Sequence, residues 1–277
     1  MSSETAIEAA LKEARVVDAV AITKDLVRKQ PARADLRSRL FQLFCLTGEW
    51  QSARTQLELL AQLDDANADL LQAVPMLFSL LAAEKQRIEV FTGRQSPPVL
   101  GEPPAWLGYQ LEGLRLFAAG QRPAAIELFQ SALSQASTSA GSLDQAPFNW
   151  IMDADCRFGP AFEVVVGSTY YWLPFSRVAK IDFPVREGLH ERVWLAASLT
   201  LTTGGTVQAS LPVRYPGTEA LKDGERLLAR ATEWEPVGGD LVIGTGGKWW
   251  TTDVGDYSLL KIRQLEIQPG TDLVPLD

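Results

Sequence analysis

Three carboxylates and one arginine lie close together in the middle of the chain, and these residue types could do chemistry. They are Asp153, Asp155, Glu163 and Arg157. Clustered carboxylate oxygens are the ligands that hard cations take, and neighbouring carboxylates can divide the roles of acid and base. One hypothesis is therefore that the C-terminal half is a metal-binding or metabolite-binding module, or a hydrolase, that uses these four residues.

Ion pairing is the second hypothesis for the same cluster, and we favour it. Asp153, Asp155 and Arg157 alternate with apolar residues, which would put the charges on one face of an extended segment. Arg157 is a counter-ion within the cluster, and Arg214 and Arg230 are two more along the chain. A buried arginine with bidentate carboxylate partners is a common structural device. A surface that contacts a partner is the third interpretation.

Other residues that could do chemistry have simpler interpretations. His190 is the only histidine, and no nucleophile signature lies near it, so we expect a surface residue. The glycine-rich stretches that begin at Thr202 and Gly244 lack the lysine of a phosphate-binding loop and are predicted to be turns. Cys45 and Cys156 lack the spacing of a disulfide framework or a zinc site, so both are predicted to be small buried side chains. We predict no metal and no cofactor.

Tryptophan is concentrated in the C-terminal half. Six tryptophans there could line a ligand pocket, but indole rings also fill the core of a small β domain efficiently. Core filling is the favoured interpretation for Trp150, Trp172, Trp194, Trp234, Trp249 and Trp250.

Composition restricts the class of protein. The chain has 277 residues, 46% of them hydrophobic and 22% charged, and a net charge of −8. Neither half is basic, so nothing predicts nucleic-acid binding. No apolar run reaches the roughly 18 residues of a membrane span, and no leader pattern is present at the N-terminus. We therefore expect a cytoplasmic protein with a protein or small-molecule partner and no membrane contact.

The first half has helical periodicity with a repeat of about 34 residues, the length of a tetratricopeptide unit. Gly48 and Gly120 stand at equivalent positions between paired helices, and Ala14 takes that position in a weaker first unit. A long helical stretch follows the second unit and contains Pro75, which should kink or divide it. Four prolines between residues 97 and 104 then predict an extended surface loop. Residues 1–138 are thus predicted to form a tetratricopeptide-like helical domain.

Such arrays are curved and receive a peptide in the groove formed by their first helices. The repeat positions predict that the groove side chains are Ser38, Gln42, Cys45, Gln110, Leu114 and Phe117. Their mixed polarity suits an amphipathic segment of a partner. The alternative is that these residues face the C-terminal domain instead.

The pattern changes after the small, polar and aperiodic stretch 134–147, where we place the domain boundary. Residues 148–277 read as short strands with one or two helical insertions, so this domain is predicted to be mostly antiparallel sheet and the whole chain α+β. The expected strands are 148–154, 161–166, 170–173, 178–183, 199–201, 206–213, 241–244, 248–253 and 257–267. The expected helices are 185–197 and 219–231.

Several motifs of the C-terminal half occur together in one known family. They are Trp150-Ile-Met-Asp-Ala-Asp with Arg157 and Gly159-Pro160, Glu163, Tyr171-Trp172 with Pro174-Phe175, the run from Leu211 to Glu219, and the run from Arg230 to Trp234. In these motifs and their order the chain resembles the ImpE/TagJ family, also called SciE-type, of bacterial type VI secretion.

The resemblance implies a function that the residues alone do not supply. It implies a non-catalytic, cytosolic accessory protein that binds the N-terminal helix of the small sheath subunit TssB. It also implies a link to sheath handling alongside the ClpV ATPase. The peptide-binding groove predicted from the repeats agrees with the first of these implications.

Overall fold

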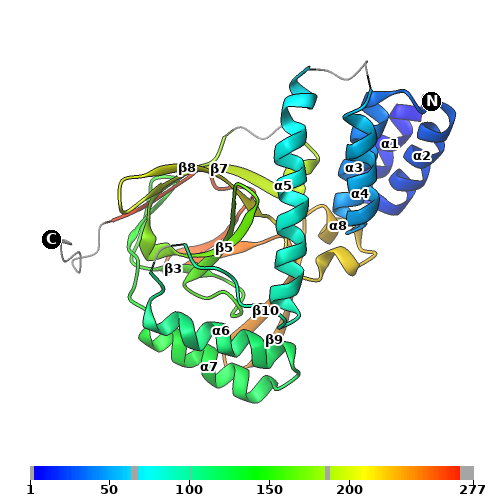
Figure 1. The fold of residues 1–277 in the computed structure, drawn as a ribbon. Coiled ribbons are helices and arrows are strands. Elements are labelled where there is room, and N and C mark those ends of the chain that lie inside the picture. Colours follow the sequence, from blue (N-terminus) through cyan, green and yellow to red (C-terminus); the bar gives the residue numbers. More distant parts are fainter. Residues whose placement is uncertain (1–2, 64–67, 101, 185–187, 269–277) are drawn as a thin grey trace.

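Antiparallel helix pairs build the N-terminal half of the chain. We describe residues 3–63, 68–100, 102–184 and 188–268 of a computed structural model (Figure 1). The helices of this half are α1 (Ser3–Lys12), α2 (Val16–Lys29), α3 (Ala34–Leu46), α4 (Trp50–Leu60), α5 (Ala68–Phe91), α6 (Ala105–Ala118) and α7 (Arg122–Gln135).

The turn inside each pair has the same backbone geometry, which confirms the repeat register. Ala14, Gly48 and Gly120 all have positive φ, at 57°, 69° and 78°. This left-handed conformation reverses the chain after a helix and favours glycine. Behind the third turn, Gly113 packs against Phe129, and a Cβ at Gly113 would lie only 2.8 Å from the ring. The small residue thus allows α6 and α7 to approach each other closely.

The pairs do not stack into one continuous curved array. α5 stands between the pairs α1 to α4 and the sheet, while α6 and α7 lie together beneath the sheet (Figure 1). Pro75 lies inside α5, and the helix continues past it to Phe91. The proline-rich loop that follows runs along the edge of the sheet, where Val99 forms a parallel bridge with Trp172.

The C-terminal half is antiparallel sheet, as expected. Its strands are β1 (Gly141–Leu143), β2 (Ala146–Phe148), β3 (Ile151–Asp153), β4 (Ala161–Val166), β5 (Thr169–Pro174), β6 (Val178–Asp182), β7 (Trp194–Leu201), β8 (Thr206–Pro212), β9 (Thr232–Gly238), β10 (Leu241–Gly246), β11 (Trp249–Thr252), β12 (Gly255–Ser258) and β13 (Gln264–Ile267). The large sheet has the order β2-β1-β13-β6-β7-β8-β4-β5, and β10-β9 and β12-β11-β3 form two smaller sheets.

Some predicted elements are wrong in detail. The helix expected over 185–197 is not formed in its described part, where His190–Arg192 is a 3-10 turn and β7 begins at Trp194; residues 185–187 lie outside the described residues. β7 pairs with β6 on one side and β8 on the other, so strand pairing overrides the local helical pattern. The helix expected over 219–231 is reduced to the single turn α8 (Gly224–Leu227).

Strand boundaries also differ from the prediction in further places. The strand expected over 148–154 is divided between the end of β2 and β3, and the one expected over 199–201 is only the end of β7. β9 was not expected, because its glutamates and Pro236 are depleted in strands, but it pairs with β10 along its length. The strand expected over 257–267 is divided into β12 and β13. The aperiodic stretch 134–147 holds the end of α7 and the start of the β1–β2 hairpin. The division into domains at this stretch stays a prediction.

Hydrophobic packing crosses from the helices to the strands. One cluster of buried side chains joins α1 to α6 with Tyr170 and Trp172 of β5, Trp194 of β7 and Leu227 of α8. A second cluster fills the space around the large sheet, with Trp250 fully buried in it. The interface between the two halves is therefore part of the core.

Candidate functional site

The cluster of carboxylates lies at the junction between α5 and the sheets, and it contains as many cations as anions. Its buried members are Glu84, Asp153, Asp155, Glu163, Arg87, Arg157, Arg214 and Lys248. Asp153, Asp155, Arg157, Glu163 and Arg214 were predicted as members. Arg230 was predicted too, but it lies outside the cluster near the surface. Its Nη1 donates to the carbonyl of Lys12 at the end of α1.

Glu163 on β4 is the centre of this cluster. Its Oε1 accepts hydrogen bonds from Arg87 Nε at 2.5 Å and Tyr170 OH at 2.7 Å. Its Oε2 lies 2.7 Å from Lys248 Nζ. Burial by itself would raise the pKa of Glu163, but Arg87 and Lys248 outweigh burial and hold the pKa at about 2. Glu163 is thus an ionised carboxylate with fixed donors on both oxygens.

Arg87 connects α5 to the strands. Besides Glu163, it donates through Nη2 to the carbonyl of Arg214 at 2.7 Å. Glu84, one turn earlier in α5, accepts from the indole of Trp194 at 2.8 Å. Burial raises the pKa of Glu84, against the lowering effect of Arg87. One face of α5 is therefore bonded to β4, β7 and the segment after β8.

Asp153 at the end of β3 has a mixed environment. Its Oδ1 accepts from Tyr215 OH at 2.9 Å, and its Oδ2 lies 3.4 Å from Lys248 Nζ. The ammonium of Lys248 also lies 3.5 Å from the centre of the Phe158 ring. Burial raises the pKa of Asp153 to about 6, although Lys248 lowers it.

Asp155 and Arg157 form a closed pair in the turn that follows β3. Arg157 donates from Nε to Asp155 Oδ1 at 2.9 Å and from Nη2 to the carbonyl of Gly244 at 3.0 Å. The amide of Gly244 in turn donates to Asp155 Oδ2 at 2.8 Å. The pair therefore fixes this turn to β10.

Arg214 has no ion pair with the other members of the cluster. Its guanidinium donates to the carbonyls of Cys45 and Leu46 at the end of α3, and to the carbonyl of Leu227. The last carbonyls of a helix have no partner inside the helix, and a cation there also interacts favourably with the negative end of the helix dipole. Burial lowers the pKa of Arg214 to about 10. Arg214 thus fastens α3 to the C-terminal half.

This geometry favours ion pairing over metal or acid-base chemistry. Every carboxylate of the cluster already has hydrogen-bond donors or cations of the protein at its oxygens. Across the parts of the chain that the structure describes, no group of three His, Cys, Asp or Glu side chains is placed to hold a metal ion. A cation would have to displace Arg87 or Lys248 from Glu163.

Three members of this cluster, Glu84, Arg87 and Lys248, were not predicted from the sequence. Arg87 and Glu84 lie three residues apart in a helical stretch, a spacing that is also typical of exposed ion pairs. Lys248 directly follows the glycine-rich stretch that begins at Gly244, and that stretch was predicted only to be a turn. Tyr170 and Trp172 were a signal for further polar groups in the core, because the hydroxyl and the indole N–H need hydrogen-bond partners when they are buried. In the structure, Trp172 Nε1 donates to Tyr170 OH at 2.7 Å.

The six predicted groove residues do not form one open groove. Cys45, Gln110 and Leu114 are buried. Gln110 Nε2 donates to the carbonyl of Cys156 at 2.7 Å, and Phe117 packs against the small cluster that contains Phe129. Ser38 and Gln42 on α3 are half-buried. The alternative, that these positions face the C-terminal half, holds for Gln110, because α6 lies under the sheet.

The remaining residues with predicted roles lie as follows. His190 is half-buried, and burial lowers its pKa. Cys45 and Cys156 are free, buried thiols. Trp172, Trp194 and Trp250 are fully buried in the core, which confirms core filling for them. The other three tryptophans, Trp150, Trp234 and Trp249, are half-buried.

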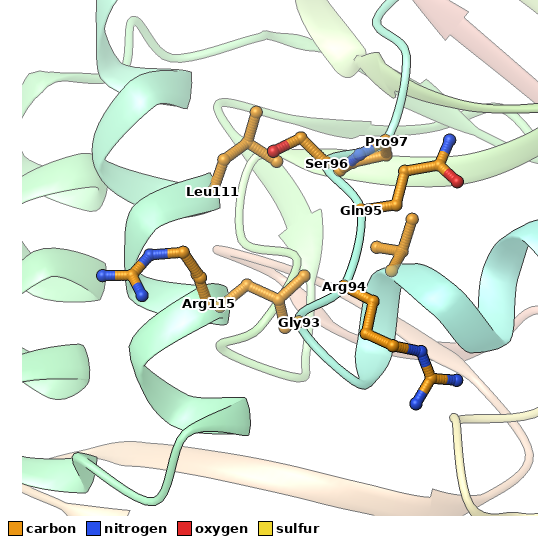
Figure 2. Close-up of a pocket in the computed structure, with 9 residues that line it drawn as sticks. Gly93, Arg94, Gln95, Ser96, Pro97, Leu111 and Arg115 are labelled. Carbon is orange, nitrogen blue, oxygen red and sulfur yellow. The ribbon is translucent and has the colours of Figure 1, made fainter.

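One cavity lies between α6 and the loop after α5 (Figure 2). It measures about 230 Å³, and its walls include Ser96, Pro97 and Leu111. The guanidinium groups of Arg94 and Arg115 point in different directions (Figure 2), and each is bonded to a glutamate of its own segment, Glu89 and Glu112. Both cationic side chains in the lining of this cavity are therefore already paired.

Asp153 gives a pH prediction. Its folded-state pKa of about 6 lies above the ordinary 3.8, so the folded state binds a proton that the unfolded chain has released. The contribution of Asp153 to stability is therefore complete below about pH 4 and is lost as the pH rises through about 6. Asp153→Asn removes this dependence. Relative to the variant, wild type should lose about 2 kcal/mol of unfolding free energy between pH 4 and pH 6.

Urea unfolding of both proteins at intervals from pH 4 to pH 7 measures this difference. A stability difference that stays constant over the range would contradict the assignment of a raised pKa to Asp153.

The fold and the cluster define a class of protein: α+β, with antiparallel helix pairs joined to an antiparallel sheet through buried ion pairs. A protein of Vibrio parahaemolyticus with a solved crystal structure has the same fold. It superposes with a TM-score of 0.86 over 96% of this chain and 98% of its own, at 19% identity. The profile of the family named ImpE protein matches residues 145–266.

A curated relative is closer in sequence. The type VI secretion system accessory component TagJ of Pseudomonas aeruginosa is 37% identical over 262 residues, which span 95% of this chain and 91% of the relative. The chain belongs to the ImpE/TagJ family.

Proposed function

We propose that this protein is a non-catalytic adaptor of a bacterial type VI secretion system that binds the N-terminal helix of the small sheath subunit TssB. The observation that carries the proposal is the 37% identity, over almost the whole chain, to a protein named as an accessory component of that system. The adaptor acts in the cytoplasm and is linked to sheath handling by the ClpV ATPase. No helix in the described part of the chain is both long and apolar enough to cross a bilayer.

The charged cluster supports an adaptor rather than an enzyme. Catalytic carboxylates need access to a substrate and a free lone pair for proton transfer. Glu163 and Asp155 have neither, because both are almost fully buried and bonded to protein donors. The cluster is therefore suited to holding α5 and α3 against the sheet, which keeps the helical surface rigid for a partner.

An open groove on the helical half suits an amphipathic helix. It lies between α2 and residues 219–222, has a volume of about 430 Å³ and is lined by Val17, Val20, Ala21, Lys24, Thr47, Glu49, Glu219, Ala220, Leu221, Lys222 and Leu227. Its lining combines apolar residues, which suit apolar anchors, with charged residues of both signs. Val17 is 55% exposed, although it is a large apolar residue on a helix. A partner that covers Val17 would bury this surface.

A charge introduced into the groove tests whether the partner helix binds there. Val17→Glu should weaken binding of a fluorescent peptide with the sequence of the TssB N-terminal helix by at least about thirtyfold, because loss of a central apolar anchor typically costs about 2 kcal/mol or more. Fluorescence anisotropy measures the affinity. Because Val17 is exposed, the variant should fold as wild type does, and circular dichroism checks this.

Val254→Glu is the matched control, since Val254 is 57% exposed and lies in the turn between β11 and β12, outside the groove. This variant should bind as wild type does. Equal affinities of wild type and Val17→Glu would show that the helix docks elsewhere.

A further inference from the structure

A second cavity lies where the last turns of α5 meet the turn that follows β8. Its volume is about 270 Å³, at the small end of the range for ligand sites. It is lined by Arg87, Ile88, Phe91, Thr92, Arg157, Pro216, Gly217 and Glu219. Two arginines of the charged cluster thus form part of a cavity wall.

Both arginines keep a nitrogen that donates no hydrogen bond to a described residue. Arg87 donates to Glu163 and to the carbonyl of Arg214 through Nε and Nη2, and its Nη1 forms only a longer ion pair with Glu84, at 3.6 Å. Arg157 donates through Nε and Nη2. No described residue accepts a hydrogen bond from Nη1 of either arginine, although a guanidinium carries five N–H donors.

These two nitrogens are reachable from solvent. Among the described residues, the fully enclosed side-chain nitrogen and oxygen atoms without a partner are Gln110 Oε1 and Trp250 Nε1, and neither Nη1 belongs to them. Yet Arg87 is only 6% exposed and Arg157 only 8%. Each arginine is therefore held by the protein, and each has one donor group that is neither hydrogen-bonded nor fully enclosed.

An aromatic ring lies beside both cations. The centre of the Phe91 ring is 5.7 Å from Cζ of Arg87 and 5.9 Å from Cζ of Arg157. Ile88 and Pro216 extend this apolar surface. Guanidinium N–H donors next to an apolar wall suit an anion that carries a small hydrocarbon body, because guanidinium groups bind carboxylates through charge-assisted hydrogen bonds.

We propose that this cavity binds a small organic carboxylate. The carboxylate accepts hydrogen bonds from Nη1 of Arg87 and Nη1 of Arg157, and the hydrocarbon part packs on Phe91 and Ile88. Glu219 is half-buried in the same wall, so its negative charge opposes the ligand and limits the affinity. This site adjoins the groove proposed for the sheath subunit at Val17, since Glu219 belongs to the lining of both.

Benzoate and benzamide are the probes, because they have nearly the same shape and only benzoate is an anion. Saturation-transfer NMR on the full-length protein, at constant ionic strength with chloride as the background anion, should detect binding of benzoate and not of benzamide. Glu219→Gln should tighten benzoate binding at least threefold. Arg157→Lys keeps the charge but removes the fork of donors, and should weaken binding at least fivefold.

Thr92→Trp tests the location of the benzoate site without changing the charged cluster. Thr92 is an exposed residue of the cavity lining, and an indole at this position would fill the cavity. This variant should fold as wild type does and lose benzoate binding. The proposal is overturned if benzoate does not bind, if benzamide binds equally well, if inorganic phosphate binds and benzoate does not, or if folded Thr92→Trp binds benzoate normally. None of these results depends on TssB, so failure here leaves the adaptor function standing.

Discussion

Glu163→Leu should lower the free energy of unfolding by about 3 to 5 kcal/mol, because removing one partner of a buried ion pair leaves the other charge uncompensated. Two cations, Arg87 and Lys248, lose their acceptor at once, and so does the hydroxyl of Tyr170. Leucine fills a similar volume, so the loss reports charge pairing rather than a cavity. Urea unfolding followed by tryptophan fluorescence measures it.

Glu58→Leu is the control for this substitution. Glu58 pairs with Arg54 at 2.9 Å on the exposed face of α4, with both side chains about half exposed. The same chemical change there should cost less than about 1 kcal/mol. If both variants lowered the free energy of unfolding equally, burial would not explain the contribution of the Glu163 ion pairs to stability.

Gly224→Ala should destabilise the protein by about 3 kcal/mol or more, at or beyond the upper end of the range for overpacking. A Cβ on Gly224 would lie 1.6 Å from the carbonyl oxygen of Ala14 and 2.6 Å from its carbonyl carbon. Both are backbone atoms of the turn between α1 and α2, which cannot rotate away as a side chain can. The packing of α8 against the first helix pair therefore requires glycine at position 224.

The matched variant is Gly108→Ala on α6, where a Cβ would meet nothing within 4 Å. Alanine there should raise the stability by about 0.5 to 1 kcal/mol through helix propensity. Thermal unfolding of both variants measures the contrast. A Gly224→Ala protein as stable as wild type would mean that α8 does not pack on the Ala14 turn.

The repeat register could be predicted because it depends on local geometry. The positions of Ala14, Gly48 and Gly120 follow from one turn conformation, which a single residue type favours. Strands β4, β6 and β8 were also predicted nearly to the residue, since their apolar runs are bounded by glycine and proline. These signals lie within ten or so neighbouring residues.

The charged cluster could be predicted only in part, because its pairs join residues far apart in the chain. Arg87 and Glu163 are 76 positions apart, and Lys248 and Asp153 are 95 apart. Nothing local distinguishes Arg87 from an exposed arginine of an amphipathic helix. The surroundings of the predicted groove residues could not be predicted for a related reason. The repeat pattern indicates which positions of a first helix would face a groove. It does not indicate that α6 and α7 lie under the sheet.

The adaptor function rests on the proposal that this chain binds TssB through the N-terminal helix of that subunit. Isothermal titration of the full-length protein with purified TssB, and with TssB lacking its N-terminal helix, tests the claim most directly. We expect saturable one-to-one binding of intact TssB and no measurable heat of binding with the truncated form. Binding that is unchanged by the truncation, or no binding of intact TssB to the folded protein, would contradict it.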